Sequence, residues 1–267
     1  MPLDSHELPD GRAVKLGRPE ASPENPKDLH LHRFLLSLTV LPKPPEVIDN
    51  TVYVKQPWSM YLNDRYGCCV FASSSHRRVT QAAMTGLQIT IDDDEVLRAY
   101  SAVTGFDPNN SNTDNGAIMV DAANWERHNA LGGDQVFAFA RVHIDPQDRK
   151  MLDLATFYFG GVWFGINLPI SARRQVGDVW DVVDRPDGQP GTWGGHAVWS
   201  PKSSPDEREV VTWAKMQRCT QSFISLYADE AWTVLPCAWE RNDPFQAINW
   251  TVLYGAMAQF GPVDPER

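Results

Sequence analysis

The sequence predicts an α+β protein, with helices in the first half of the chain and mostly antiparallel strands in the second. Apolar residues recur at helical spacing in the stretches 68–86, 92–105 and 115–133. Short apolar or alternating runs, which are typical of strands, fill most of the later part and are separated by turn residues. The 267 residues suffice to bury a substantial core. We expect a cleft where the two halves meet.

The ends of the predicted helices carry the expected residues. The stretch 68–86 stops at a glycine, and 92–105 opens with acidic residues and also ends at a glycine. The stretch 115–133 ends at a double glycine. The remaining elements that we expect are helices at 145–160 and 220–231 and strands at 135–144, 161–169, 195–201, 209–215 and 230–236.

Composition changes divide the chain into three parts. Residues 1–50 are rich in proline and charge, which predicts an extended arm with one apolar anchor, "LHRFLLSLTVLP" at 31–42. Residues 51–236 carry the regular elements and form the predicted domain. Residues 237–267 form a C-terminal extension that is rich in aromatic side chains.

Charge and cysteine usage exclude several classes of function. A net charge of −10 without a basic cluster argues against nucleic acid as a partner. The N-terminus has no apolar segment of a secretory signal, and no apolar run is long enough for a membrane span. We therefore expect a chain that is cytoplasmic at synthesis and has no membrane partner. Four cysteines predict no disulfide framework, although a pair between Cys219 and Cys237 stays open.

Two adjacent cysteines, Cys68 and Cys69, lie where the first helix begins, directly after Gly67. A helix N-terminus and a nearby imidazolium both lower the pKa of a thiol, so this is a candidate position for a nucleophile. The alternative is a small buried apolar residue. His196 follows a double glycine and opens an apolar strand, which fixes its ring. The other histidines lie in the arm, in loops or on helices that turn them away: His6, His30, His32, His76, His128 and His143.

The segment "N-x-x-x-G-C-C-V-F-A" resembles the nucleophile motif of papain-like cysteine peptidases, and "GGHAV" resembles the strand that carries their histidine. The resemblance covers about residues 55–236 and implies a papain-like two-lobed fold, a helical lobe followed by an antiparallel β-rich lobe. It makes Cys69 the nucleophile and His196, 127 residues further along, the general base. Asn63 would supply a side-chain amide to the oxyanion, and Trp213 would shield the third member of the site.

The third catalytic position departs from the family pattern, because Val211 stands where the family has an asparagine. On a regular strand we expect its neighbour Thr212 to face away from His196. A backbone carbonyl or Asn167 is the expected replacement. Residues 1–50 are too short and too rich in proline for us to expect that they form the long helical propeptide of the family. We therefore interpret the chain as a divergent member of bacterial or phage type.

Three functions follow from this interpretation. The first is a hydrolase that cleaves amide bonds of a protein or peptide with a Cys69–His196 dyad. The second is a weakened or inactive relative that serves as a structural subunit of an assembly such as a virus particle, with partners held by the arm and the extension. The third is a bacterial cell-wall amidase. No cofactor and no metal is expected, because "HLH" at 30–32 and "DDDE" at 92–95 lack the other ligands of a metal site.

Overall fold

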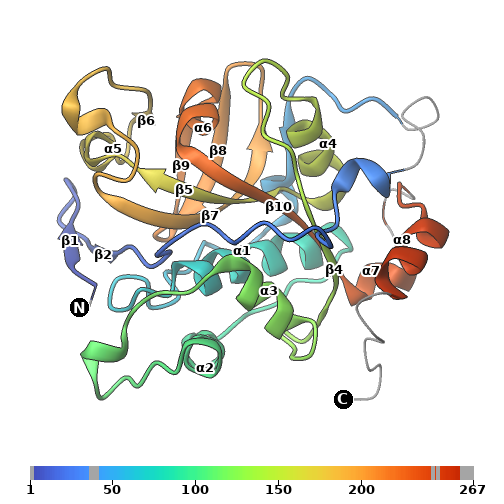
Figure 1. Ribbon diagram of the computed structural model, residues 1–267, viewed down its shortest axis with the longest axis horizontal. Coiled ribbons are helices and arrows are strands. Elements are labelled where there is room, and N and C mark those ends of the chain that lie inside the picture. Colours follow the sequence, from blue (N-terminus) through green and yellow to red (C-terminus); the bar gives the residue numbers. More distant parts are fainter. Residues whose placement is uncertain (1–2, 36–41, 242–243, 245–246, 259–267) are drawn as a thin grey trace.

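The computed structural model describes residues 3–35, 42–241, 244 and 247–258. Within these ranges the chain is α+β, which confirms the predicted fold class, and it forms a helical lobe and a β-rich lobe (Figure 1). Half of the apolar anchor expected at 31–42, residues 36–41, and the end of the C-terminal extension lie outside the described residues.

An eight-stranded sheet forms the centre of the described molecule, with the order β4-β10-β5-β7-β8-β9-β6 and a short strand, β3, paired with β7. All its pairs are antiparallel except that of β6 with β9. The strands are β3 (Ile48–Asp49), β4 (Val136–Arg141), β5 (Val162–Leu168), β6 (Val179–Trp180), β7 (Gly194–Ser203), β8 (Glu207–Thr212), β9 (Lys215–Thr220) and β10 (Ala228–Pro236).

Helices cover both faces of the sheet. One face packs on α1, with α2 and α3 beyond it in the lower lobe of Figure 1, and the other face packs on α4 and α6. The helices are α1 (Cys69–Met84), α2 (Asp93–Thr104), α3 (Met119–Glu126), α4 (Lys150–Phe159), α5 (Ile170–Arg174), α6 (Gln221–Tyr227), α7 (Cys237–Arg241) and α8 (Trp250–Met257). Short 3-10 helices span Leu31–Arg33, Asn50–Tyr53, Ser111–Thr113 and Pro186–Gly188.

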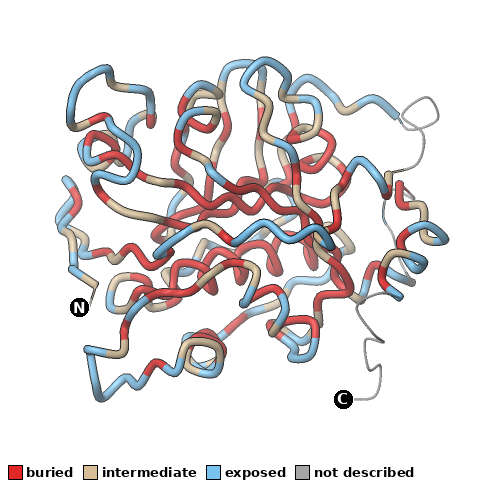
Figure 2. Tube along the Cα trace, in the orientation of Figure 1, coloured by how far each residue is buried: buried red, intermediate tan, exposed pale blue. Residues whose placement is uncertain are grey.

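Helix α1 is buried along nearly its whole length (Figure 2), so its polar side chains need partners inside the protein. The indole Nε1 of Trp163 donates to Ser73 Oγ at 2.7 Å, and that of Trp199 donates to Thr80 Oγ1 at 3.0 Å. Arg77 forms a buried ion pair with Glu126 of α3. These bonds fix α1 against the sheet on one side and against α3 on the other, and they hold its first residue in place.

The N-terminal arm runs between the two lobes, where Figure 1 shows it as a blue trace across the front of the molecule. It starts as a hairpin of β1 (Ser5–Glu7) and β2 (Ala13–Lys15) and continues in extended form. Its apolar side chains lie in the core of the chain itself: Leu8, Val14, Leu16, Leu29, Leu31 and Phe34. The described part of this arm is therefore a component of the fold.

Candidate active site

Cys69 is the first residue of α1 and is 1% exposed. Burial raises the pKa of its thiol to about 11, although the backbone N–H groups of Ala197 and Gly17 and the charge of Arg18 act in the opposite direction. Ala197 directly follows His196 on β7. The fold therefore brings the Cys69 thiol to the strand that carries His196, with the thiol protonated at neutral pH.

Cys68 faces a different environment from its neighbour. Its buried thiol donates a hydrogen bond to the Tyr61 carbonyl at 3.2 Å, and burial raises its pKa well above the usual value. A protonated thiol with a carbonyl partner is a poor nucleophile. Of the two cysteines, Cys69 is the one beside the histidine strand.

His196 lies on β7 opposite Ile166 of β5 and is buried. Its Nε2 bonds with Thr212 Oγ1 at 2.7 Å, and its ring stacks on Trp213 at a centroid distance of 4.6 Å and an angle of 22°. Its Nδ1 has no hydrogen-bond partner among the described residues. Burial, and then the positive charge of Arg18, lower the pKa of His196 to about 3, so the imidazole is neutral.

Thr212 therefore faces the imidazole, and the expectation that it faces away from His196 is wrong. Val211 pairs with Trp199 and shares with it the sheet face that packs on α1, so Thr212 lies on the other face, together with His196. The next two residues, Trp213 and Ala214, have φ values of 47° and 62° and form the tight turn to β9. This turn holds the indole over the imidazole.

The side chain of Asn167, the other expected replacement, has its hydrogen bonds elsewhere. It bonds with Asp229 and with Arg18 of the arm. The resemblance gives Asn63 the role of an amide that binds the oxyanion. Its Nδ2 donates to the Lys15 carbonyl at 3.0 Å and to the Tyr66 carbonyl at 3.1 Å. The amide thus already holds a backbone carbonyl of a peptide segment in the cleft.

That peptide segment is Lys15–Arg18, which the sequence alone did not point to. The N–H of Lys15 donates to the Asn63 carbonyl at 2.9 Å, and the Gly17 carbonyl accepts from Ala117 N–H at 2.8 Å. On the other wall, Arg18 N–H donates to the Gly195 carbonyl at 3.2 Å. Segment 15–18 is therefore bound to both lobes through its backbone and covers Cys69 and His196.

Glycines make room for this close approach. A Cβ atom on Gly17 would lie 1.8 Å from the Gly67 carbonyl oxygen, and one on Gly195 would lie 1.9 Å from the Arg18 carbonyl oxygen. A Cβ on Gly116 would lie 2.3 Å from the Gly17 oxygen. The slot is thus as wide as a polypeptide backbone: a side chain at Gly116 or Gly195 would block it, and a side chain at Gly17 would keep the segment out of it.

Asp114 fixes the loop in front of the thiol. Its buried carboxylate accepts from Gly67 N–H at 3.0 Å, from Tyr100 OH at 2.7 Å and from Lys15 Nζ at 2.9 Å. It thereby ties the start of α1, helix α2 and the arm together. Sequence reasoning missed this residue, because the polar loop 106–114 gives no local sign of a buried carboxylate.

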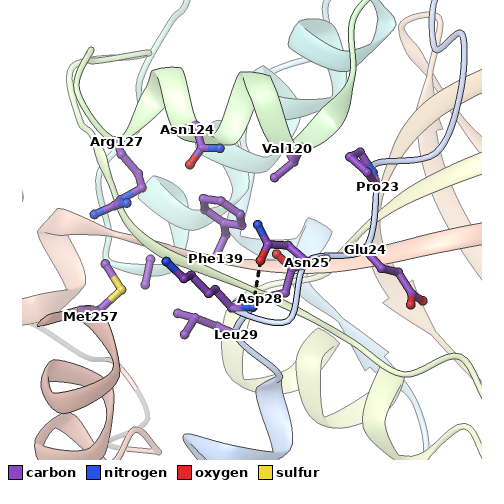
Figure 3. A pocket seen from close by; sticks show the side chains of 12 residues that line it. Pro23, Glu24, Asn25, Asp28, Leu29, Val120, Asn124, Arg127, Phe139 and Met257 are labelled. Carbon is purple, nitrogen blue, oxygen red and sulfur yellow. Dashed lines mark hydrogen bonds between the residues drawn. The ribbon is translucent and has the colours of Figure 1, made fainter. Parts of the chain in front are cut away.

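A separate cavity of about 420 Å³ lies further along the arm (Figure 3). It opens between arm residues 23–29, α3, β4 and α8, with Phe139 and Leu29 among its apolar lining. The Nε of Arg127 on its wall has no hydrogen-bond partner among the described residues. None of the sequence-predicted site residues lines this cavity.

Three other features considered in the sequence analysis are disulfides, metal ligands and membrane-spanning helices. The four cysteines are free thiols, so Cys219 and Cys237 do not pair. No group of three or more potential metal ligands occurs among the described residues. The described helices include none that is both long and apolar enough to cross a bilayer.

The two lobes, with a cysteine at the start of α1 and a histidine on β7, define the papain-like fold of cysteine proteases. No family model and no curated protein sequence matches the chain. Among solved structures, the chain is similar to xylellain, a cysteine protease from Xylella fastidiosa, with a TM-score of 0.61 and 13% identity over 83% of this chain and 96% of the other.

Two further structures have the same fold. Digestive procathepsin L 3 of Tenebrio molitor larval midgut matches with a TM-score of 0.53 and 11% identity, over 78% of this chain and 75% of the other. The cysteine protease CMS1MS2 of Carica candamarcensis, in complex with E-64, matches with a TM-score of 0.50 and 13% identity, over 71% of this chain and 98% of the other. At these identities the likeness concerns the fold.

Proposed function

We propose that the protein is a thiol-dependent hydrolase of peptide amide bonds, with Cys69 as the nucleophile and His196 as the general base. The observation that carries this proposal is the cleft itself: it already binds a peptide backbone between a helix-start cysteine and a histidine whose Nε2 is held by Thr212. Because Thr212 holds Nε2, Nδ1 is left for the thiol. This is the nitrogen that has no partner in the covered state.

The reaction follows from these positions. Once a substrate lies in the slot, the Cys69 thiol transfers its proton to His196 Nδ1, and the thiolate attacks the amide carbon. Asn63 Nδ2 and the backbone N–H of Cys69 stabilise the oxyanion. The imidazolium then protonates the leaving amine, which departs from the acyl-enzyme. A water molecule, deprotonated by His196, attacks the thioester and releases the acid and the free thiol.

In this structure segment 15–18 occupies the slot, and we call this the covered state. With segment 15–18 in the slot, burial favours the neutral thiol and the neutral imidazole, so the ion pair that makes a cysteine reactive is not formed. We therefore expect low activity until the segment leaves the cleft. A structural role in an assembly has no specific observation in its favour, because the described part of the arm lies in the cleft of its own chain.

The test is hydrolysis of a quenched-fluorescence peptide library under reducing conditions, by the full chain and by the full chain with Gly17→Ala, which displaces the segment. We expect turnover to be higher with Gly17→Ala and to be abolished by adding Cys69→Ser or His196→Ala. The matched control is Cys68→Ser, which changes the neighbouring thiol and should retain turnover. A folded Gly17→Ala chain whose Cys69 is readily alkylated but that cleaves no peptide would refute the proposal.

A further inference from the structure

The side chain of Arg18 fills a pocket beside the candidate catalytic pair. It is fully buried, and its guanidinium donates three hydrogen bonds. Nη1 bonds with Glu230 Oε1 at 2.9 Å, and Nη2 bonds with Asp229 Oδ1 at 2.7 Å and Asn167 Oδ1 at 3.2 Å. All three acceptors belong to β5 and β10 of the β-rich lobe, and none belongs to the arm.

The pocket walls form further hydrogen bonds besides those with Arg18, and one of them comes from the arm, because Ser22 N–H donates to Glu230 Oε2 at 3.2 Å. Trp232 Nε1 donates to Glu230 Oε2 at 2.8 Å, and Asn167 Nδ2 donates to Asp229 Oδ2 at 2.8 Å. Gly165 forms the floor, where a Cβ atom would lie 2.6 Å from the Cγ of Glu230 and 2.9 Å from the Cζ of Arg18. The sheet therefore supplies the acceptors that surround the Arg18 guanidinium, and a side chain at residue 165 would take the space that this guanidinium fills.

The pocket is negatively charged and therefore requires a positively charged side chain as its occupant. Two carboxylates face one guanidinium, and the Glu230 side chain is 0% exposed. A buried carboxylate that loses its partner keeps the full cost of desolvation. When segment 15–18 leaves the slot, the pocket thus presents two acidic groups and an amide oxygen to whatever peptide replaces it.

Arg18, whose side chain fills the pocket, is the next residue after the one that contacts the Cys69 thiol. Gly17 is the segment residue whose N–H interacts with Cys69, and Arg18 follows it. The backbone N–H of Arg18 binds the Gly195 carbonyl, beside His196. A peptide backbone in the slot therefore delivers the neighbouring side chain directly into this pocket.

We infer that the pocket of Gly165, Asn167, Asp229 and Glu230 is a recognition site for the guanidinium of an arginine in a substrate peptide, and that Arg18 is its resident occupant. This inference rests on the proposed function, because it requires that the cleft receives substrate peptides. Three acceptors spread around a planar fork suit arginine, whereas lysine offers a shorter point charge. Citrulline has the same shape without the charge.

The test measures binding of peptides in a chain that cannot react. The full-length Cys69→Ser chain with Arg18→Ala is titrated by calorimetry with acetyl-Leu-Gly-Arg-amide, which copies residues 16–18. The matched peptides carry lysine or citrulline in place of arginine. We expect the arginine peptide to bind at least roughly tenfold more tightly than either, since hydrogen bonds to charged groups are involved. Adding Glu230→Gln or Gly165→Ala should remove the difference.

Small probes give a second readout that does not depend on the peptide backbone. Millimolar ethylguanidinium should raise the melting temperature of the Arg18→Ala chain, whereas ethylammonium and ethylurea should have little effect. The unsubstituted chain, whose pocket is full, should respond to none of them. If Arg18→Ala does not fold with any probe, the same peptides are titrated against the chain with Cys69→Ser and Gly17→Ala, in which the pocket walls are unchanged.

The inference is overturned if arginine and citrulline peptides bind equally, or if ethylurea stabilises the Arg18→Ala chain as well as ethylguanidinium does. Because no step of this test uses the thiol, its result is independent of hydrolysis. A pocket that prefers arginine in a chain that cleaves no peptide would refute the proposed function alone. Hydrolysis without any preference for arginine would refute the inference alone.

Discussion

Gly17→Ala is the substitution that tests most directly whether the arm governs the candidate site. The new methyl carbon would lie 1.8 Å from the Gly67 carbonyl oxygen, well inside any real contact. Gly67 cannot retreat freely, because its N–H is bonded to the buried carboxylate of Asp114 at 3.0 Å. The backbone of Gly17 itself is outside the left-handed region, so alanine adds overlap without torsional strain. The segment must therefore move away from the thiol.

The size of the effect follows from the cost of overpacking. An extra methyl group in a well-packed site costs about 1–3 kcal/mol. If this cost falls on the covered state alone, the open fraction rises about 5-fold to about 160-fold, since about 1.36 kcal/mol corresponds to a factor of ten. When opening and closing are fast, the rate of Cys69 alkylation rises by the same factor.

The assay is alkylation by iodoacetamide at neutral pH, followed at each of the four thiols by peptide mass spectrometry. The half-buried thiol of Cys237 serves as an internal reference. Gly255→Ala is the matched control, because a Cβ atom there meets nothing within 4 Å. A folded Gly17→Ala chain whose Cys69 reacts no faster than that of Gly255→Ala would show that the arm does not limit access to the thiol.

Three further predictions concern residues around the site. In the Gly17→Ala chain, Thr212→Val should lower turnover at least roughly tenfold and shift its pH profile, whereas Thr212→Ser should retain both. The unfolded chain binds protons at His76 and His196 below pH 6.5, whereas their folded pKa values are about 4 and about 3. Urea titrations should therefore show each histidine removing about 1.4 kcal/mol of unfolding free energy per pH unit as the pH falls from 6.5 to about 4. Glu126→Gln should cost about 3–5 kcal/mol by the same measurement, because it leaves a buried arginine unpaired, whereas Glu207→Gln at an exposed pair should cost at most about 1 kcal/mol.

Local patterns were sufficient for most regular elements. The helix expected at 92–105 is observed at Asp93–Thr104, with Gly105 in the left-handed conformation that ends it. The strand expected at 195–201 is β7, Gly194–Ser203. These elements follow from periodicity and from residues at their ends, which act over a few positions. The two-residue strand β6 and the short helix α5 carry too few residues for such a pattern.

Local sequence patterns likewise predicted one part of the candidate site and missed another. A cysteine at a helix start and a histidine on a strand are local features, and the chain brings them to the same cleft. The contact of Thr212 with His196 was missed because the face of a strand depends on its partner, here on Val211 packing against α1. The path of Lys15–Arg18 was missed because its contacts lie far away in the sequence.

Segment 15–18 is held by backbone contacts and by a side-chain pocket, and the two would contribute differently to the recognition of a substrate peptide. Gly67, Gly116 and Gly195 leave space for a backbone only, and the bonds there are made to main-chain groups that every peptide has. Apart from the position of Gly17, where a Cβ atom would lie 1.8 Å from the Gly67 carbonyl oxygen, such a slot does not distinguish one side chain from another. Discrimination must then come from a pocket at its side, and the acidic pocket around Arg18 is charged and buried, so an unmatched side chain leaves carboxylates without a partner. The same pocket that anchors the arm in the covered state would thus select the peptide that replaces it.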